Sequence, residues 1–186
     1  MRHKLLLLLL LLLPLSLKGQ TYSLSTNVVD WANYGTLNVE GNVLIDRHFS
    51  FVAGGKYNPW VMNSNKHDDT VVCNKSTTLY AGARYWPWYV FSGWWIQAKA
   101  QYQSRYSTGI WRAAVDDYMA VGAGLAAGYS IMVTKSFNID LGIGAWGGQY
   151  LKYNLYHCQD CMELRDSGQR PFIKFDDISV SLTYVF

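Results

Sequence analysis

The stretch ISVSLTYVF (residues 178–186) alternates large apolar side chains with small polar ones. In an extended strand, successive side chains point to opposite faces of the sheet. The alternation therefore predicts a strand with one apolar face and one polar face. The apolar face carries Ile178, Val180, Leu182, Tyr184 and Phe186, and the polar face carries Ser179, Ser181 and Thr183.

The same period of two recurs along most of the chain, with turn residues between the segments. It is found in segments 36–43, 49–58, 78–86, 94–103, 119–131 and 137–144. A weaker strand is expected over 22–31, where Val28, Val29 and Asp30 blur the alternation, and we interpret this as a β-bulge. Together these segments predict about eight strands, the smallest usual number for an outer-membrane barrel.

The connections between the expected strands alternate in length. Segments 45–48, 89–92 and 134–136 are short, whereas 60–76, 104–117 and 154–171 are long and polar, and only the connection near 33–35 departs from this rule. Outer-membrane barrels have short periplasmic turns and longer extracellular loops. We therefore expect an all-β, eight-stranded, antiparallel, up-and-down transmembrane barrel in the outer membrane, with both termini periplasmic.

The amino-terminal segment has the pattern of a secretory signal peptide. Arg2 and Lys4 precede the unbroken apolar run 5–13, and a short polar exit follows. The run is too short for a membrane-spanning helix, which needs roughly 20 apolar residues. We expect residues 1–20 to be the signal peptide and residues 21–186 to form a single barrel domain. The net charge of the chain is only +3, and its Lys and Arg residues are scattered along the sequence. A nucleic-acid-binding protein usually carries a basic stripe, so nucleic acid is not expected as a partner.

The polar face of the expected strands carries charged groups of both signs, which indicates a polar lumen and an apolar outer wall. These groups are Glu40, Lys56, Arg84, Lys99, Asp140 and Asp177. Because buried charges must be paired or solvated, we predict that they form salt bridges inside the barrel. Small residues on the same face are expected to leave room for Tyr80, Trp86, Trp95 and Arg84. These small residues are Gly122, Gly124, Gly128, Gly142, Gly144 and Gly148. A functional alternative for this face is a narrow proton or ion path.

Aromatic residues are expected to form girdles at both membrane interfaces. The periplasmic girdle would contain Trp86, Trp88, Tyr89, Phe91, Trp94 and Trp95. The extracellular girdle would contain Tyr57, Trp60, Tyr102, Tyr106, Tyr150 and Tyr153.

Three parts of the sequence support a family resemblance: STNVVDWANYGTLNVEG (25–41), GARYW (82–86) and the terminal YVF (184–186). With them the chain resembles an uncharacterised family of small outer-membrane barrels of Bacteroidota, of the domain-of-unknown-function type. More broadly it is similar to eight-stranded barrels of the OmpA and OmpX type. The resemblance implies that the barrel-assembly machinery recognises the last strand, with Tyr184 and Phe186 as the assembly signal. It implies no catalytic, cofactor-binding or metal-binding residues.

The three cysteines, Cys73, Cys158 and Cys161, fall in expected extracellular loops. A disulfide is one interpretation, either between Cys158 and Cys161 or between one of them and Cys73. The alternative is a zinc site, because HCQDC (157–161) has the spacing of half such a site and Cys73 or His67 could complete it.

We expect a protein without catalytic activity or cofactor, which has a structural role or binds a surface protein or glycan through its loops, with membrane lipid around the barrel. Tyr106, Ile110 and Trp111 form an apolar patch in the third long connection. The alternatives are a narrow pore and a rim enzyme acting on outer-membrane lipid or peptide. The rim enzyme would draw on polar residues of the loops, namely His67, Asp68, Asp69, Ser104 and His157.

Overall fold

The structure is a computed structural model that describes residues 21–63, 71–108, 115–156 and 163–186. It contains ten strands and one short helix within these ranges. They are β1 (Tyr22–Asn27), α2 (Val28–Ala32), β2 (Leu37–Asp46), β3 (Phe49–Asn58), β4 (Val61–Asn63), β5 (Val71–Tyr85), β6 (Gly93–Thr108), β7 (Val115–Met132), β8 (Phe137–Tyr156), β9 (Leu164–Ser167) and β10 (Pro171–Val185). No helix among these residues is long and apolar enough to cross a membrane.

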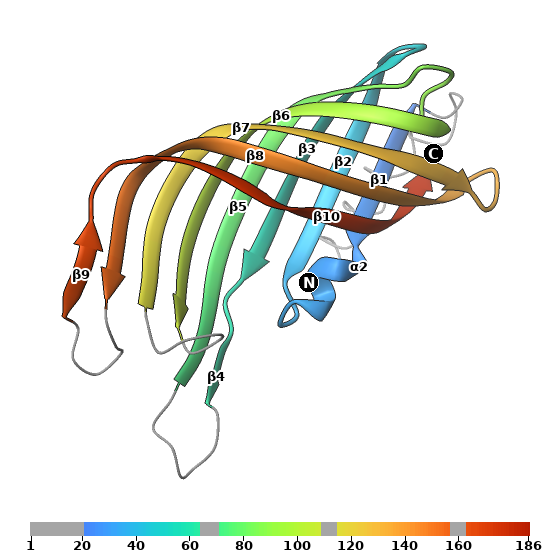
Figure 1. Ribbon diagram of the computed structural model, residues 1–186. Helices are drawn as coiled ribbons and strands as arrows, with labels where there is room; N and C mark the ends of the chain where they lie inside the picture. Colours follow the sequence, from blue (N-terminus) through green and yellow to red (C-terminus); the bar gives the residue numbers. More distant parts are fainter. Residues whose placement is uncertain (1–20, 64–70, 109–114, 157–162) are drawn as a thin grey trace, which may run out of the picture.

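Eight of the strands close into a barrel (Figure 1). Each pairs antiparallel with the next, and β10 pairs with both β8 and β1, which closes the sheet. The short strands β4 and β9 lie outside the ring and extend the edges of β5 and β8. The predicted fold class, an all-β, eight-stranded, antiparallel, up-and-down barrel, is confirmed.

The two ends of the barrel differ, and we call them the turn end and the loop end. The turn end carries the short connections after β2, β5 and β7, together with the start of β1 and the end of β10, where Tyr22 and Phe186 exchange backbone hydrogen bonds of 3.0 and 2.9 Å. At the loop end, β5, β6, β7 and β8 extend well beyond β1, β2 and β3 (Figure 1). The expected long loops are therefore shorter than predicted, because ladder pairing continues to Thr108 in β6 and to Tyr156 in β8.

The expected strand over 22–31 is wrong in its second half. Strand β1 ends at Asn27, and α2 follows directly. The Asn27 side-chain oxygen accepts a hydrogen bond from the Val29 N–H at 3.1 Å, which caps the helix, and its amide donates to Asp30 Oδ2 at 2.8 Å. The blurred alternation thus marks a helical turn instead of a bulge.

The apolar face of the strands is the outside of the barrel. Leu125 and Ile143, on the outer face of β7 and β8, are 66% and 70% exposed, whereas Lys99 and Asp140, on the inner face, are only 7% and 5% exposed. A water-soluble protein has the opposite arrangement, with charges outside and apolar side chains inside. The barrel therefore has an apolar outer wall and a polar interior.

Glycines on the inner face make room for Trp95. A Cβ atom at Gly128 would lie 2.3 Å from the indole, and one at Gly142 would lie 2.7 Å from it. Gly122 and Gly148 have a different role, because a Cβ at either position would meet the backbone of the neighbouring strand at about 2 Å. These four glycines thus accommodate Trp95 and the close approach of β7 and β8.

Replacing Gly128 by alanine should destabilise the barrel, because the new methyl group would meet both Trp95 and the Leu141 carbonyl oxygen. We expect Gly128→Ala to lower the free energy of unfolding by about 2 kcal/mol, measured by urea titration in lipid or detergent. The neighbouring outward change Ala127→Val is the control and should stay within about 0.5 kcal/mol. Equal stability of the two variants would contradict this packing.

Candidate functional site in the barrel lumen

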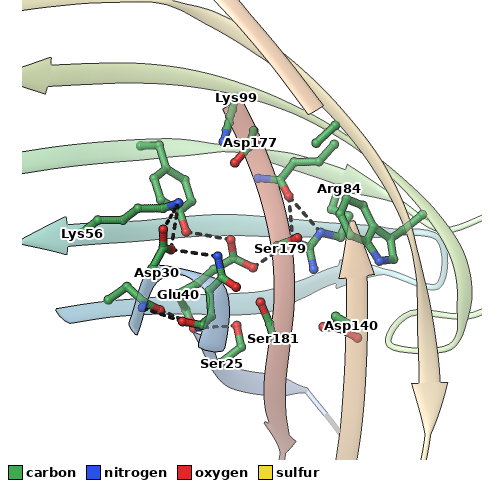
Figure 2. Close-up of a pocket in the computed structure, with 16 residues that line it drawn as sticks. Ser25, Asp30, Glu40, Lys56, Arg84, Lys99, Asp140, Asp177, Ser179 and Ser181 are labelled. Atoms are coloured by element: carbon green, nitrogen blue, oxygen red, sulfur yellow. Dashed lines mark hydrogen bonds and ion pairs between the residues drawn. The ribbon is translucent and has the colours of Figure 1, made fainter. Parts of the chain in front are cut away.

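Three ion pairs lie in the lumen and join parts of the wall that are not adjacent (Figure 2). Arg84 of β5 contacts Glu40 of β2 at 2.8 Å, and Lys99 of β6 contacts Asp177 of β10 at 2.5 Å. Lys56 of β3 contacts Asp30 of α2 at 2.9 Å. Five of the six charged residues that the sequence suggested for the lumen therefore lie in ion pairs, and Asp30 is a partner that sequence reasoning missed.

Polar side chains extend the pair between Arg84 and Glu40. Gln97 Oε1 accepts hydrogen bonds from Arg84 Nε and Nη2 at 3.1 and 2.6 Å, and the Tyr80 hydroxyl donates to Glu40 Oε2 at 2.9 Å. The Arg84 guanidinium also lies 4.2 Å from the centre of the Trp95 ring. Charge-assisted bonds and a cation–π contact together hold this guanidinium in one place.

Asp140 departs from the expected pairing. Its Oδ2 atom accepts a hydrogen bond from Thr183 Oγ1 at 2.7 Å, while its buried Oδ1 atom has no hydrogen-bond partner among the described residues. With Asp30 included, the lumen network holds four carboxylates and three cationic side chains. Asp140 is thus the one predicted lumen charge that has no ion-pair partner among the described residues.

Little open space remains around the ion pairs. A cavity of about 40 Å³ lies among Glu40, Arg84, Asp140 and Asp177. A cavity of this size holds roughly two water molecules. The centre of the lumen is filled by side chains, as expected for a barrel of eight strands.

An aromatic cluster occupies the turn end of the lumen. Trp86, Phe91 and Trp95 are all buried and pack with Val185. Phe91 has the left-handed backbone angle φ +66°, which is rare for a bulky residue, and its carbonyl oxygen accepts a 2.7 Å hydrogen bond from Asn138. The turn after β5 therefore folds into the mouth of the barrel.

This cluster corrects the expected periplasmic girdle. Trp86, Phe91 and Trp95 lie inside the barrel, whereas Trp88, Tyr89 and Trp94 are exposed. Tryptophan suits both environments, since it is amphipathic at an interface and large enough to fill a core. The sequence alone did not distinguish the two positions.

A second aromatic cluster lies on the inner face toward the loop end. Tyr118, Trp146, Tyr150 and Tyr153 are buried there, so Tyr150 and Tyr153 do not belong to an exposed girdle. Lys174 donates a 2.7 Å hydrogen bond to the Tyr118 hydroxyl and lies 4.0 Å from the centre of that ring. Lys174 was missed because the register of β10 shifts between Lys174 and Asp177.

The remaining predicted residues fall into two groups. Cys73 is buried and has no disulfide partner among the described residues, and the predicted pairings with Cys158 and Cys161 stay predictions because both lie outside them. Tyr184 is exposed on the outer face beside Phe186, and Ser104 lies on β6. The others lie outside the described residues: His67, Asp68, Asp69, Ile110, Trp111, His157, Cys158 and Cys161. Within the described ranges no cluster of His, Cys, Asp and Glu could hold a metal ion.

Comparison with known proteins gives one family. A family model described as "Protein of unknown function (DUF3575)" matches residues 5–186. No curated protein and no solved structure matches the chain.

Removing one member of the Arg84–Glu40 pair should leave a buried charge without compensation. We expect Arg84→Gln to lower the free energy of unfolding by about 3 kcal/mol and the double variant with Glu40→Gln to recover part of that loss. The exposed pair of Arg170 and Asp166 is the control, and Arg170→Gln should cost less than about 1 kcal/mol. Similar losses in Arg84→Gln and Arg170→Gln would show that the lumen pair is solvated.

Proposed function

The chain belongs to the DUF3575 family of proteins of unknown function, and we propose that it is an integral outer-membrane protein without catalytic activity. One observation supports this proposal above the others: the outer wall of the barrel is apolar and its interior is charged. Such a wall is unfavourable in water, because each Å² of exposed apolar surface costs about 25 cal/mol. It suits a hydrocarbon environment, where a closed sheet also satisfies every backbone polar group.

The orientation follows from the two ends. Outer-membrane barrels place their short turns in the periplasm, which would put the turn end and both termini there. This is consistent with residues 1–20 acting as an export signal. The exposed Tyr184 in the last strand fits recognition by the barrel-assembly machinery, as the similarity to barrels of the OmpA and OmpX type and of Bacteroidota implies.

The loop end is the part that would contact a surface protein or glycan. There the long strands β5 to β8 rise beyond the rest of the barrel, and β4 and β9 widen this sheet (Figure 1). Tyr57 and Trp60 are exposed beside it. A rigid sheet that carries variable loops is a common platform for binding.

The filled lumen favours a non-conducting barrel over the narrow pore. The ion pairs cross the centre, and the aromatic cluster of Trp86, Phe91 and Trp95 occupies the turn end. Water and ions would have to displace both. The rim enzyme has no support of this kind, since most of its candidate residues lie outside the described part of the chain.

Membrane fractionation tests the location. The protein should be found in the outer membrane and should migrate faster on an SDS gel when it is not boiled, because a folded barrel stays compact in detergent. After boiling, the protein should migrate more slowly, at the position of the unfolded chain. A protein confined to the soluble periplasm would contradict the proposal.

Planar-bilayer recording tests the closed lumen. The purified barrel should give no discrete conductance steps, because side chains fill its centre. A porin reconstituted in the same way serves as the positive control. Regular single-channel steps from this protein would favour the pore instead.

A further inference from the structure

A second cavity lies on the loop side of the ion pairs, and we call it the vestibule. It measures about 150 Å³, and its walls include Asn33, Asn74, Ser76, Gln101, Arg105 and Trp146. Asp30, Lys56 and Asp177 of the lumen network also line it. Amides and hydroxyls thus dominate the vestibule, in contrast to the charged centre of the lumen.

Two residues that line the vestibule each hold a buried polar atom that has no hydrogen-bond partner among the described residues. Asn74 is only 4% exposed, and its Oδ1 atom accepts no bond among the described residues. The Nε atom of Arg105 is likewise buried and donates no bond there. Buried polar groups are nearly always satisfied by protein, water or ligand. The accessible surface of each atom is below 1 Å², so neither atom itself faces the cavity, and Asn74 and Arg105 line it with the other parts of their side chains.

Arg105 gives the vestibule a positive charge that has no counterion in the part of the chain that the structure describes. Asp30 and Asp177 are already paired with Lys56 and Lys99, at 2.9 and 2.5 Å. Within the described ranges, no carboxylate lies at ion-pair distance from Arg105. A guanidinium in this state favours a carboxylate, which it can bind through two parallel hydrogen bonds.

We infer that the vestibule binds a carboxylate-bearing sugar unit of a glycan. The carboxylate would lie against Arg105, and the sugar hydroxyls would bond to Asn74, Ser76 and Gln101. The volume of about 150 Å³ suits a single sugar ring. This inference rests on the proposed function, in which the loop end faces the cell exterior, and it names the class of surface partner.

Calorimetric titration of the folded barrel in detergent tests the inference, with D-glucuronate as the probe. Glucose and acetate are the comparison ligands, since one lacks the charge and the other lacks the ring. Glucuronate should bind saturably and about ten-fold or more tightly than either, because a hydrogen bond to a charged group contributes more than a neutral one. Equal binding of acetate would overturn the sugar assignment and indicate a simple anion site.

Two variants and a matched control separate the roles of the side chains. Arg105→Gln should weaken glucuronate binding about ten-fold and leave glucose binding unchanged, whereas Asn74→Ala should weaken both sugars alike. Lys75→Gln removes the same charge from an exposed side chain next to Asn74 and should change nothing. An equal effect of Lys75→Gln and Arg105→Gln would overturn the site.

The folded state is checked in the same samples by the faster migration of unboiled protein. A barrel that shows this shift but binds no glucuronate would overturn the vestibule inference and leave the outer-membrane proposal standing. A protein that lacks the shift and stays soluble would instead contradict the proposed function.

Discussion

Closure of the sheet through β10 is the constraint on which the rest of the structure depends. This strand pairs with β8 along most of its length and with β1 from Ser181 to Val185, and these two pairings close the ring of strands. Where β1 stops, the Asn27 side chain continues the pairing: it donates to the Ile178 carbonyl at 3.2 Å and accepts from the Val180 N–H at 3.0 Å. The side-chain amide of Asn27 thus connects three features: the junction of β1 with β10, the cap of α2 and the lumen residue Asp30.

Closure at eight strands leaves an interior that only side chains can fill, and here most of them are polar. The three ion pairs tie β2 to β5, β6 to β10 and α2 to β3, so each fastens elements that share no backbone ladder. Buried pairs of this kind contribute little net stability, but a wrong arrangement would leave charges unpaired. Their main effect is therefore to specify how the opposite walls of the barrel face each other.

Much of this architecture could be predicted from the sequence, because the period of two assigns each side chain to the inside or the outside of the wall. Leu141 and Asp140 illustrate this, since neighbours in sequence lie on opposite faces. The failures have local causes. Asn27 and Asp30 form a helix cap that only the spacing of an Asn and an acid three residues later could have indicated. The positions of Trp86 and Phe91 depend on a turn that folds into the barrel. The pairing of Lys56 with Asp30 depends on which carboxylate lies nearest in the folded chain. Neither feature can be predicted from a local sequence pattern.

The unequal strand lengths give the barrel a direction. On the side of β5 to β8 the sheet continues far past the last ion pair, whereas on the side of β1 to β3 it stops near α2 (Figure 1). The barrel wall at the loop end is therefore high on the side of β5 to β8 and low on the side of β1 to β3. Among the described residues, the path from the loop end to the ion pairs is shorter over β1 to β3 than over β5 to β8, so the barrel wall is unequally high around its interior.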